Sequence, residues 1–160
     1  VLMDGSHTID DCYNVTKKTL LNVFEELKSH DVFLGGILLK PNMVISGKNC
    51  SNQATVSEVS EYTIKCLKET VPHDVPGIVF LSGGQSNEIA TQHLNEMNRL
   101  GNLPWNLSFS YGRALQQPSI SSWKGEENNV LIAQKALYKR SKLNSDATQG
   151  NYSNDSEATF

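Results

Sequence analysis

The stretch Ile78-Val79-Phe80-Leu81-Ser82-Gly83-Gly84-Gln85-Ser86 joins a short apolar run to a glycine-containing turn. A run of this length bounded by glycine is typical of a strand, and the turn after it is tight. Beyond the turn, apolar side chains recur at helical spacing and predict a helix lined by Ile89, Ala90, Leu94, Met97 and Leu100. Strand, turn and helix in this order are the repeating unit of α/β proteins.

Similar units lie on both sides of this stretch. Residues 32–40 are almost wholly apolar and stop at Pro41, which predicts a strand buried on both faces with Lys40 at its end. Residues 107–111 alternate between apolar and polar side chains and predict a third strand. Further helices are predicted over residues 11–30 and over about 126–142, and a segment that contains Pro118 precedes the second of them. Another helix is predicted to begin at a capping box formed by Thr55 and Glu58 and to end before Pro72 and Pro76.

This order of elements predicts an α/β fold with about three parallel strands and flanking helices. The helical connections are long enough for right-handed crossovers between parallel strands. A closed barrel of eight such units needs roughly 250 residues, and the chain has 160. We therefore expect an open sheet with two unpaired edges. From Asn144 onward apolar residues are scarce, so we expect one domain over residues 1–143 and a flexible tail over 144–160.

Composition excludes several classes of function. The formal net charge is -3 and no basic run is present, which argues against nucleic-acid binding. Apolar stretches fall far short of the roughly 20 residues that cross a bilayer, and residues 1–7 do not resemble a signal peptide. The three scattered cysteines, Cys12, Cys50 and Cys66, suit reduced thiols, so we expect a cytoplasmic protein. The four histidines lack metal-ligand spacing, and we expect them to face solvent and no metal to be bound.

Polar groups suited to chemistry follow all three predicted strands. Lys40 ends the first strand, where a lowered amine pKa would allow attack on a carbonyl carbon, as in a Schiff-base enzyme. A lysine that merely ends a strand and faces water fits the same position, and spacing alone does not decide between the two. We find no convincing general base among the remaining acidic residues.

The other two strand ends suit an anion. Ser82, Gly83 and Gly84 follow the second strand, where missing side chains permit close approach of a phosphate to the backbone ahead of a helix. Ser110, Gly112 and Arg113 follow the third strand and add a hydroxyl, a bare backbone position and a guanidinium that binds phosphate through two bonds. A glycine pair that simply makes a turn is the alternative for the second strand.

Three segments resemble motifs of class I fructose-bisphosphate aldolases, the plant forms in particular. In the family's order they are Leu38-Leu39-Lys40-Pro41-Asn42-Met43-Val44, Leu81-Ser82-Gly83-Gly84-Gln85-Ser86 and Phe109-Ser110-Tyr111-Gly112-Arg113-Ala114-Leu115-Gln116. The resemblance runs from about Leu2 to about Gly150 and corresponds to the carboxyl-terminal half of the family's chain. It implies that the fold is part of a (β/α)8 TIM barrel that is not closed.

The resemblance also implies an activity and its site. Lys40 would form the iminium with the substrate ketone, and a phosphate would be held by Ser82, Gly83, Gly84, Ser110, Gly112 and Arg113. The reaction would be the glycolytic cleavage of fructose 1,6-bisphosphate into dihydroxyacetone phosphate and glyceraldehyde 3-phosphate. The partners are thus sugar phosphates, and no metal or organic cofactor is needed because the iminium is the electron sink.

The sequence departs from the family in three respects. The family's acid/base residues that precede this segment are not in the sequence, so we expect a truncated chain with little or no activity alone. Gly35 and Ile37 replace a glutamate and a threonine, and the chain ends in Ala158-Thr159-Phe160 where the family has a terminal tyrosine. The alternative function is a non-catalytic half-barrel that associates with a complementary or full-length aldolase chain through its open strand edges.

Overall fold

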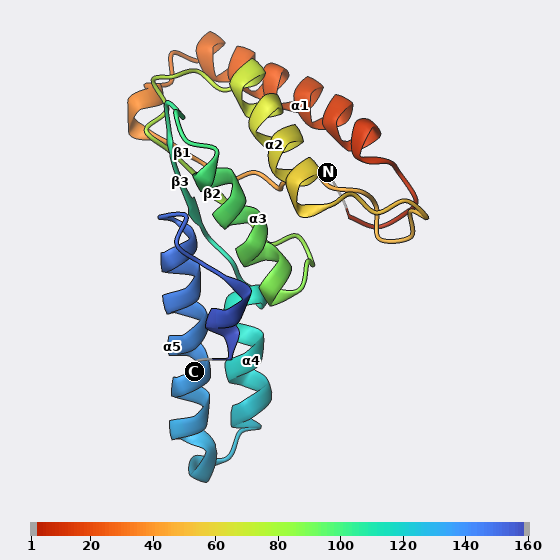
Figure 1. Ribbon diagram of the computed structural model, residues 1–160. Coiled ribbons are helices and arrows are strands. Elements are labelled where there is room, and N and C mark those ends of the chain that lie inside the picture. Colours follow the sequence, from red (N-terminus) through yellow and green to blue (C-terminus); the bar gives the residue numbers. More distant parts are fainter. Residues whose placement is uncertain (1–2, 159–160) are drawn as a thin grey trace.

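The computed structural model describes residues 3–158, whose centre is a three-stranded parallel sheet (Figure 1). The strands are β1 (Leu38–Leu39), β2 (Gly77–Phe80) and β3 (Asn106–Phe109), in the spatial order β1-β2-β3. Leu39 is in register with Ile78, and Phe80 with Phe109. The predicted open α/β architecture with three parallel strands is confirmed. Thr159 and Phe160, which carry the predicted departure at the terminus, lie outside the described residues.

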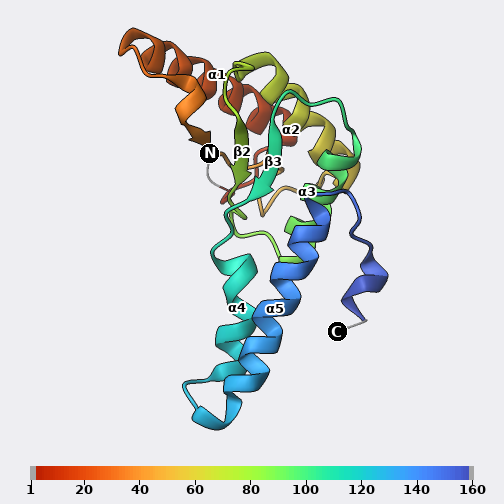
Figure 2. The ribbon, with the colours of Figure 1, turned by 90° about the vertical axis from the view of Figure 1, so that its left-hand side faces the viewer.

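Helices connect the strands and continue after them. Three α-helices belong to the sheet layer: α1 (Ile9–Ser29), α2 (Val56–Thr70) and α3 (Asn87–Arg99). They lie on one side of the sheet, and Figure 2 shows its other face without a helix in front. The helices α4 (Arg113–Trp123) and α5 (Val130–Ala147) form a hairpin that projects from this layer. Residues 3–158 also contain short 3-10 helices: η1 (Leu34–Gly36), η2 (Glu127–Asn129) and η3 (Asn154–Glu157).

The core lies between the sheet and its single helical layer. Ile78, Phe80 and Leu107 occupy one face of the sheet and are buried. Val79 and Ser108 occupy the opposite face and are only half-buried. The helices contribute further buried side chains, including those of Val59, Ile64, Leu67, Ala90, Leu94 and Met97. Burial of apolar area in this layer is the main favourable term for folding.

The predicted strand over residues 32–40 is wrong in length and in burial. Only Leu38 and Leu39 form a strand, and η1 occupies the glycine pair before them. The side chain of Phe33 is 79% exposed and that of Leu38 is 62% exposed. An apolar run of this kind is buried only where another strand pairs with its outer edge and a layer covers its second face. Neither feature is present among residues 3–158, so the run is exposed.

The helical prediction is correct for α1, α2 and α3 and partly wrong after β3. The predicted helix over 126–142 is displaced, because α5 spans Val130–Ala147, and α4 was not predicted. Pro118 lies inside α4 and lacks the N–H that a helix interior uses. The helix persists because it packs along α5, where Ser119 Oγ donates to the Ala133 carbonyl at 2.9 Å.

The predicted boundary between residues 143 and 144 falls inside α5. Asn144 and Ala147 are fully buried, and Tyr152 is buried as well. The amide N–H of Tyr152 donates to Asn95 Oδ1 at 2.9 Å, which attaches the segment after α5 to α3. The described part of the tail therefore packs on the domain, and its mobility stays a prediction.

The capping box predicted at the start of α2 is confirmed. The Thr55 hydroxyl accepts from the Glu58 N–H at 3.3 Å, and Glu58 Oε2 accepts from the Thr55 N–H at 2.7 Å. Thr8 and Asp11 form a second box at the start of α1. Both boxes satisfy amide groups that a helix leaves without partners at its first turn. None of the helices in the described part of the chain is long and apolar enough to cross a membrane.

Candidate active site

The carboxyl ends of all three strands lie at one edge of the sheet because the strands are parallel. Lys40 directly follows β1, and two hydrogen bonds extend the pairing beyond the strands. The Leu81 N–H donates to the Pro41 carbonyl at 3.1 Å, and the Ser110 N–H donates to the Phe80 carbonyl at 2.8 Å. The predicted site residues that follow the three strands are thus gathered at this edge.

The turn after β2 is built on two glycines. Gly83 has a φ of 59° and Gly84 a φ of 86°, values in the left-handed region that side chains disfavour. The turn closes when the Gln85 N–H donates to the Ser82 carbonyl at 3.0 Å. Ser86 then caps α3, and its Oγ accepts from the Ile89 N–H at 3.2 Å. The turn therefore leads directly into the positive end of a helix.

The turn after β3 brings Arg113 to the same place. Gly112 immediately precedes α4, and Arg113 is the first residue of that helix. A Cβ atom added at Gly84 would lie 3.5 Å from Arg113 Nη2. Arg113 and the glycine turn are thus neighbours, although 29 positions of sequence separate residues 84 and 113. The absent side chain at Gly84 leaves the guanidinium close to the backbone of the turn.

A cavity of about 460 Å³ lies at this edge. Its wall contains three of the predicted site residues, Gly83, Gly84 and Arg113, together with Met3, Asp4, Asn42, Lys48 and Leu81. The other predicted residues, Ser82, Ser110, Gly112 and Lys40, lie at the same edge outside this wall. Lys40 is exposed, and Ser82 is buried.

Two charged residues of the cavity were not predicted. Lys48 and Asp4 come from loops that pair with each other through backbone hydrogen bonds. The Lys48 N–H donates to the Met3 carbonyl at 2.7 Å, and the Asn49 N–H donates to the Gly5 carbonyl at 2.8 Å. No spacing pattern connects residues 3–7 with residues 47–49, so this pairing became visible only in the structure. Two cations and one carboxylate therefore line the cavity.

His93 is buried and contacts Gln85 of the glycine turn, so the expectation that all four histidines face solvent is wrong for this residue. It is 5% exposed, because it lies on the buried side of α3. Its Nδ1 is 2.6 Å from Gln85 Oε1, so a neutral ring with a proton on Nδ1 donates to this amide oxygen. Desolvation by burial lowers the pKa of His93 from 6.5 to about 4. A second cavity, of about 350 Å³, lies here and shares Met3, Lys48 and Gly84 with the first.

These features define an α/β protein with a lysine and a cationic cavity at the carboxyl edge of a parallel sheet. The family model of class I glycolytic fructose-bisphosphate aldolase matches residues 1–160. The chain is 54% identical over 153 residues to a probable class 1 fructose-bisphosphate aldolase of Xanthomonas axonopodis, covering 95% of this chain and 46% of that relative. The chain therefore belongs to the class I fructose-bisphosphate aldolase family.

Other comparisons agree with this assignment. A cytosolic fructose-bisphosphate aldolase of Arabidopsis thaliana is 48% identical over 158 residues, which cover 98% of this chain and 40% of the relative. A crystal structure of the aldolase of Plasmodium falciparum, in complex with TRAP and a small-molecule inhibitor, superimposes with a TM-score of 0.93 at 48% identity. The matched region covers 95% of this chain and 44% of the Plasmodium aldolase chain. The chain thus spans less than half the length of these relatives.

We predict that the buried His93 makes the protein less stable as the pH falls from 7 to 5. Between the unfolded pKa of 6.5 and the folded pKa of about 4, the unfolded chain binds a proton that the folded chain does not, so acid favours unfolding. Between pH 7 and pH 5 this proton uptake lowers the free energy of unfolding by about 2 kcal/mol. Urea unfolding at pH 7, 6 and 5 measures it.

The His93→Asn variant should lose most of this pH dependence, whereas the exposed-residue control His30→Asn should keep it. Asparagine retains a side-chain donor for Gln85 and does not titrate. An equal pH dependence in the His93→Asn variant and the wild-type chain would contradict the assignment.

Proposed function

We propose that this chain carries the Schiff-base lysine and a phosphate site of an aldolase that cleaves fructose 1,6-bisphosphate into dihydroxyacetone phosphate and glyceraldehyde 3-phosphate in glycolysis. One observation supports it above all: Lys40 follows β1 at the edge where Gly83, Gly84 and Arg113 wall a cavity. An amine and a neighbouring anion site are the two groups needed to bind a phosphorylated ketone. The family assignment and the names of the relatives support the same reaction.

Lys40 would act as the nucleophile. Its neutral amine attacks the ketone carbon, and loss of water gives a protonated iminium. Transfer of the C4 hydroxyl proton to solvent water then breaks the C3–C4 bond, and the bonding electrons move into the iminium to form an enamine. Glyceraldehyde 3-phosphate leaves, the enamine takes a proton from water at C3, and addition of a second water to the iminium releases dihydroxyacetone phosphate from the lysine. No metal or organic cofactor takes part in this scheme.

The phosphate would bind at the glycine turn. Gly83 and Gly84 permit an oxyanion to approach the backbone N–H groups, which point toward an anion in such turns. Arg113 would donate two charge-assisted hydrogen bonds, and Lys48 would add a second cation across the cavity. Ser82, Ser110 and Gly112 would supply further hydroxyl and amide donors from the same edge.

The chain alone should turn over substrate slowly. Lys40 is exposed on an open sheet, and loss of positioned acid/base groups typically costs about 10² to 10⁴-fold in rate. Iminium formation and phosphate binding are therefore sharper tests than turnover. We place the protein in the cytoplasm, as the name of the Arabidopsis relative supports.

We predict that borohydride in the presence of dihydroxyacetone phosphate labels Lys40. Hydride addition to the iminium carbon converts it to a stable secondary amine, and peptide mass spectrometry locates the modified lysine. The Lys40→Met variant should lose the label, and the control Lys135→Met, which removes an exposed lysine of α5, should keep it. Labelling spread over many lysines, or none at Lys40, would refute the proposed nucleophile.

We also predict that inorganic phosphate shifts the amide NMR signals of Gly83 and Gly84 in a saturable way. Arg113→Met should weaken this binding about tenfold, because charge-assisted hydrogen bonds are lost. Lys48→Met should weaken it about threefold, because the lysine is exposed and partly screened by salt. The control Lys124→Met, at the exposed end of α4, should change nothing. Equal affinities of the Arg113→Met variant and the wild-type chain would contradict this phosphate site.

A second function, association with another aldolase chain, is supported by the open edge of β1. Phe33 and Leu38 are exposed there, and the outer edge of β1 has no strand partner within residues 3–158. Exposed strand edges next to apolar side chains favour pairing with another chain. A complementary half-barrel or a full-length aldolase would supply the missing strand.

We predict that the chain forms a mixed species with a full-length class I aldolase in sedimentation velocity. A double variant, Phe33→Ser with Leu38→Ser, should abolish this species because it removes the apolar side chains beside the edge. The control Leu131→Ser, which changes a side chain of α5 that is 71% exposed, should leave it intact. If this chain sediments as a monomer at all mixing ratios, association is excluded. If only the control variant loses the complex, the contact surface is the α4–α5 hairpin.

A further inference from the structure

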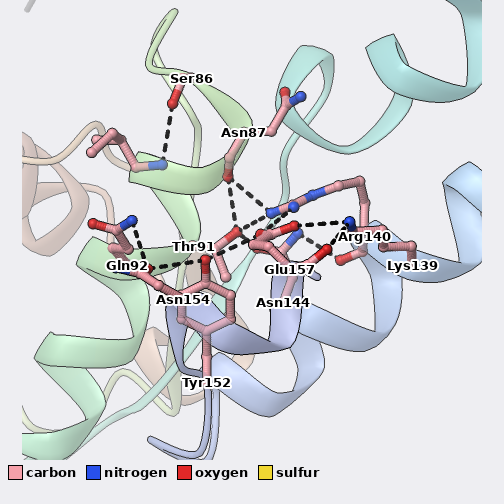
Figure 3. Close-up of polar contacts among 11 residues, drawn as sticks. Ser86, Asn87, Thr91, Gln92, Lys139, Arg140, Asn144, Tyr152, Asn154 and Glu157 are labelled. Carbon is pink, nitrogen blue, oxygen red and sulfur yellow. Dashed lines mark hydrogen bonds and ion pairs between the residues drawn. The ribbon is translucent and has the colours of Figure 1, made fainter. Parts of the chain in front are cut away.

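A buried cation lies behind the glycine turn, on the helix hairpin. Arg140 belongs to α5 and is 3% exposed. Figure 3 shows its contacts with residues of α3 and of the tail. Its Nη1 donates to Glu157 Oε1 at 2.5 Å. Its Nη2 donates to the Asn87 carbonyl at 3.1 Å and to Thr91 Oγ1 at 2.6 Å. The guanidinium therefore joins three segments: α5, the start of α3 and the 3-10 helix η3.

The two acceptors on α3 lie one turn apart, at Asn87 and Thr91. Asn87 is the first residue of α3 and follows Ser86, which caps the helix and ends the glycine turn. The Thr91 hydroxyl lies 2.9 Å from the Asn87 carbonyl and 2.9 Å from Asn144 Oδ1. Nη2 of Arg140 and the Thr91 hydroxyl thus both contact the Asn87 carbonyl, at the start of the helix that follows the glycine turn.

Glu157 provides the counter-charge for Arg140. This carboxylate also accepts from the Tyr152 hydroxyl at 3.1 Å and lies 3.3 Å from Lys139 Nζ. A buried guanidinium without a paired anion is strongly unfavourable. Loss of the Glu157 charge is therefore expected to draw the guanidinium of Arg140 toward water and away from Asn87 and Thr91.

We propose that Arg140 is a positioning residue for the glycine turn over residues 82–86, and that Glu157 of the tail keeps Arg140 in place. Docking of η3 then couples to phosphate binding through the first turn of α3. This inference rests on the phosphate site proposed above for its effect on affinity. Its effect on α3 does not depend on that site, because the hydrogen bonds of Arg140 are present without an anion.

Hydrogen exchange tests the positioning directly in the full 160-residue chain. The Glu157→Gln variant keeps the size of the side chain and removes its charge, and Glu126→Gln makes the same change at an exposed residue before η2. In the Glu157→Gln variant we expect the Ala90 N–H, which donates to the Ser86 carbonyl, to exchange about tenfold faster. The Met97 amide, in the last turns of α3, should be unaffected. An unchanged rate at Ala90 would overturn the inference.

Phosphate titration tests the consequence for binding. At a temperature where circular dichroism shows both variants folded, we expect Glu157→Gln to weaken phosphate binding about threefold to tenfold and Glu126→Gln to leave it unchanged. Tyr152→Phe removes a hydrogen bond of the same tail without removing a charge. For each degree of lost thermal stability, it should therefore reduce the phosphate affinity less than Glu157→Gln does. Affinity that follows stability alone in the three variants would overturn the positioning role.

The two proposals fail in different ways. Absence of a saturable shift at Gly83 and Gly84 in the wild-type chain would refute the phosphate site, and the exchange rate at Ala90 would still decide the role of Arg140. Saturable binding with equal affinity in Glu157→Gln and the wild-type chain would refute the coupling and leave the phosphate site standing.

Discussion

Parallel pairing of the three strands is the constraint on which the rest of the structure depends. It places the residues that follow β1, β2 and β3 at one edge, although they lie far apart in sequence. The same pairing requires crossovers, and α2 and α3 supply them on a single side of the sheet. The alternation of a strand would place Lys40 on the uncovered face with Leu38. Reactive groups and unpartnered apolar surface thus arise from one arrangement, an open sheet covered on one side.

Buried side chains contact the glycine turn and the helix that follows it. Gly83 and Gly84 adopt left-handed backbone conformations without side chains that could lock them. The Nδ1 atom of His93 contacts the side-chain amide oxygen of Gln85, and Nη2 of Arg140 donates to the carbonyl of Asn87, the first residue of α3. Both supporting side chains are buried, so their hydrogen bonds face little competition from water. The phosphate site that we propose at this turn would therefore depend in part on residues outside the wall of its cavity.

Local sequence patterns were sufficient for the elements that a single layer stabilises. Periodicity and capping predicted α1, α2 and α3, and strand ends predicted Lys40, Gly83 and Arg113 at one edge. The errors came from long-range contacts. Residues 32–40 lack the neighbours that burial requires, and α4 survives Pro118 by packing on α5. The burial of His93 and the position of Lys48 likewise depend on segments distant in sequence, which spacing does not reveal.

The charge of the cavity is a local property and does not follow from the composition. The chain has a formal net charge of -3, yet Lys48 and Arg113 outnumber Asp4 in the cavity wall. At physiological ionic strength charges are screened over about 8 Å, so the remaining acidic surface has little effect at the turn. Capture of a phosphate would then depend on direct hydrogen bonds from Arg113 and the backbone more than on long-range attraction. Because such bonds require exact placement, the positioning role that we propose for Arg140 would act together with the cations of the cavity wall.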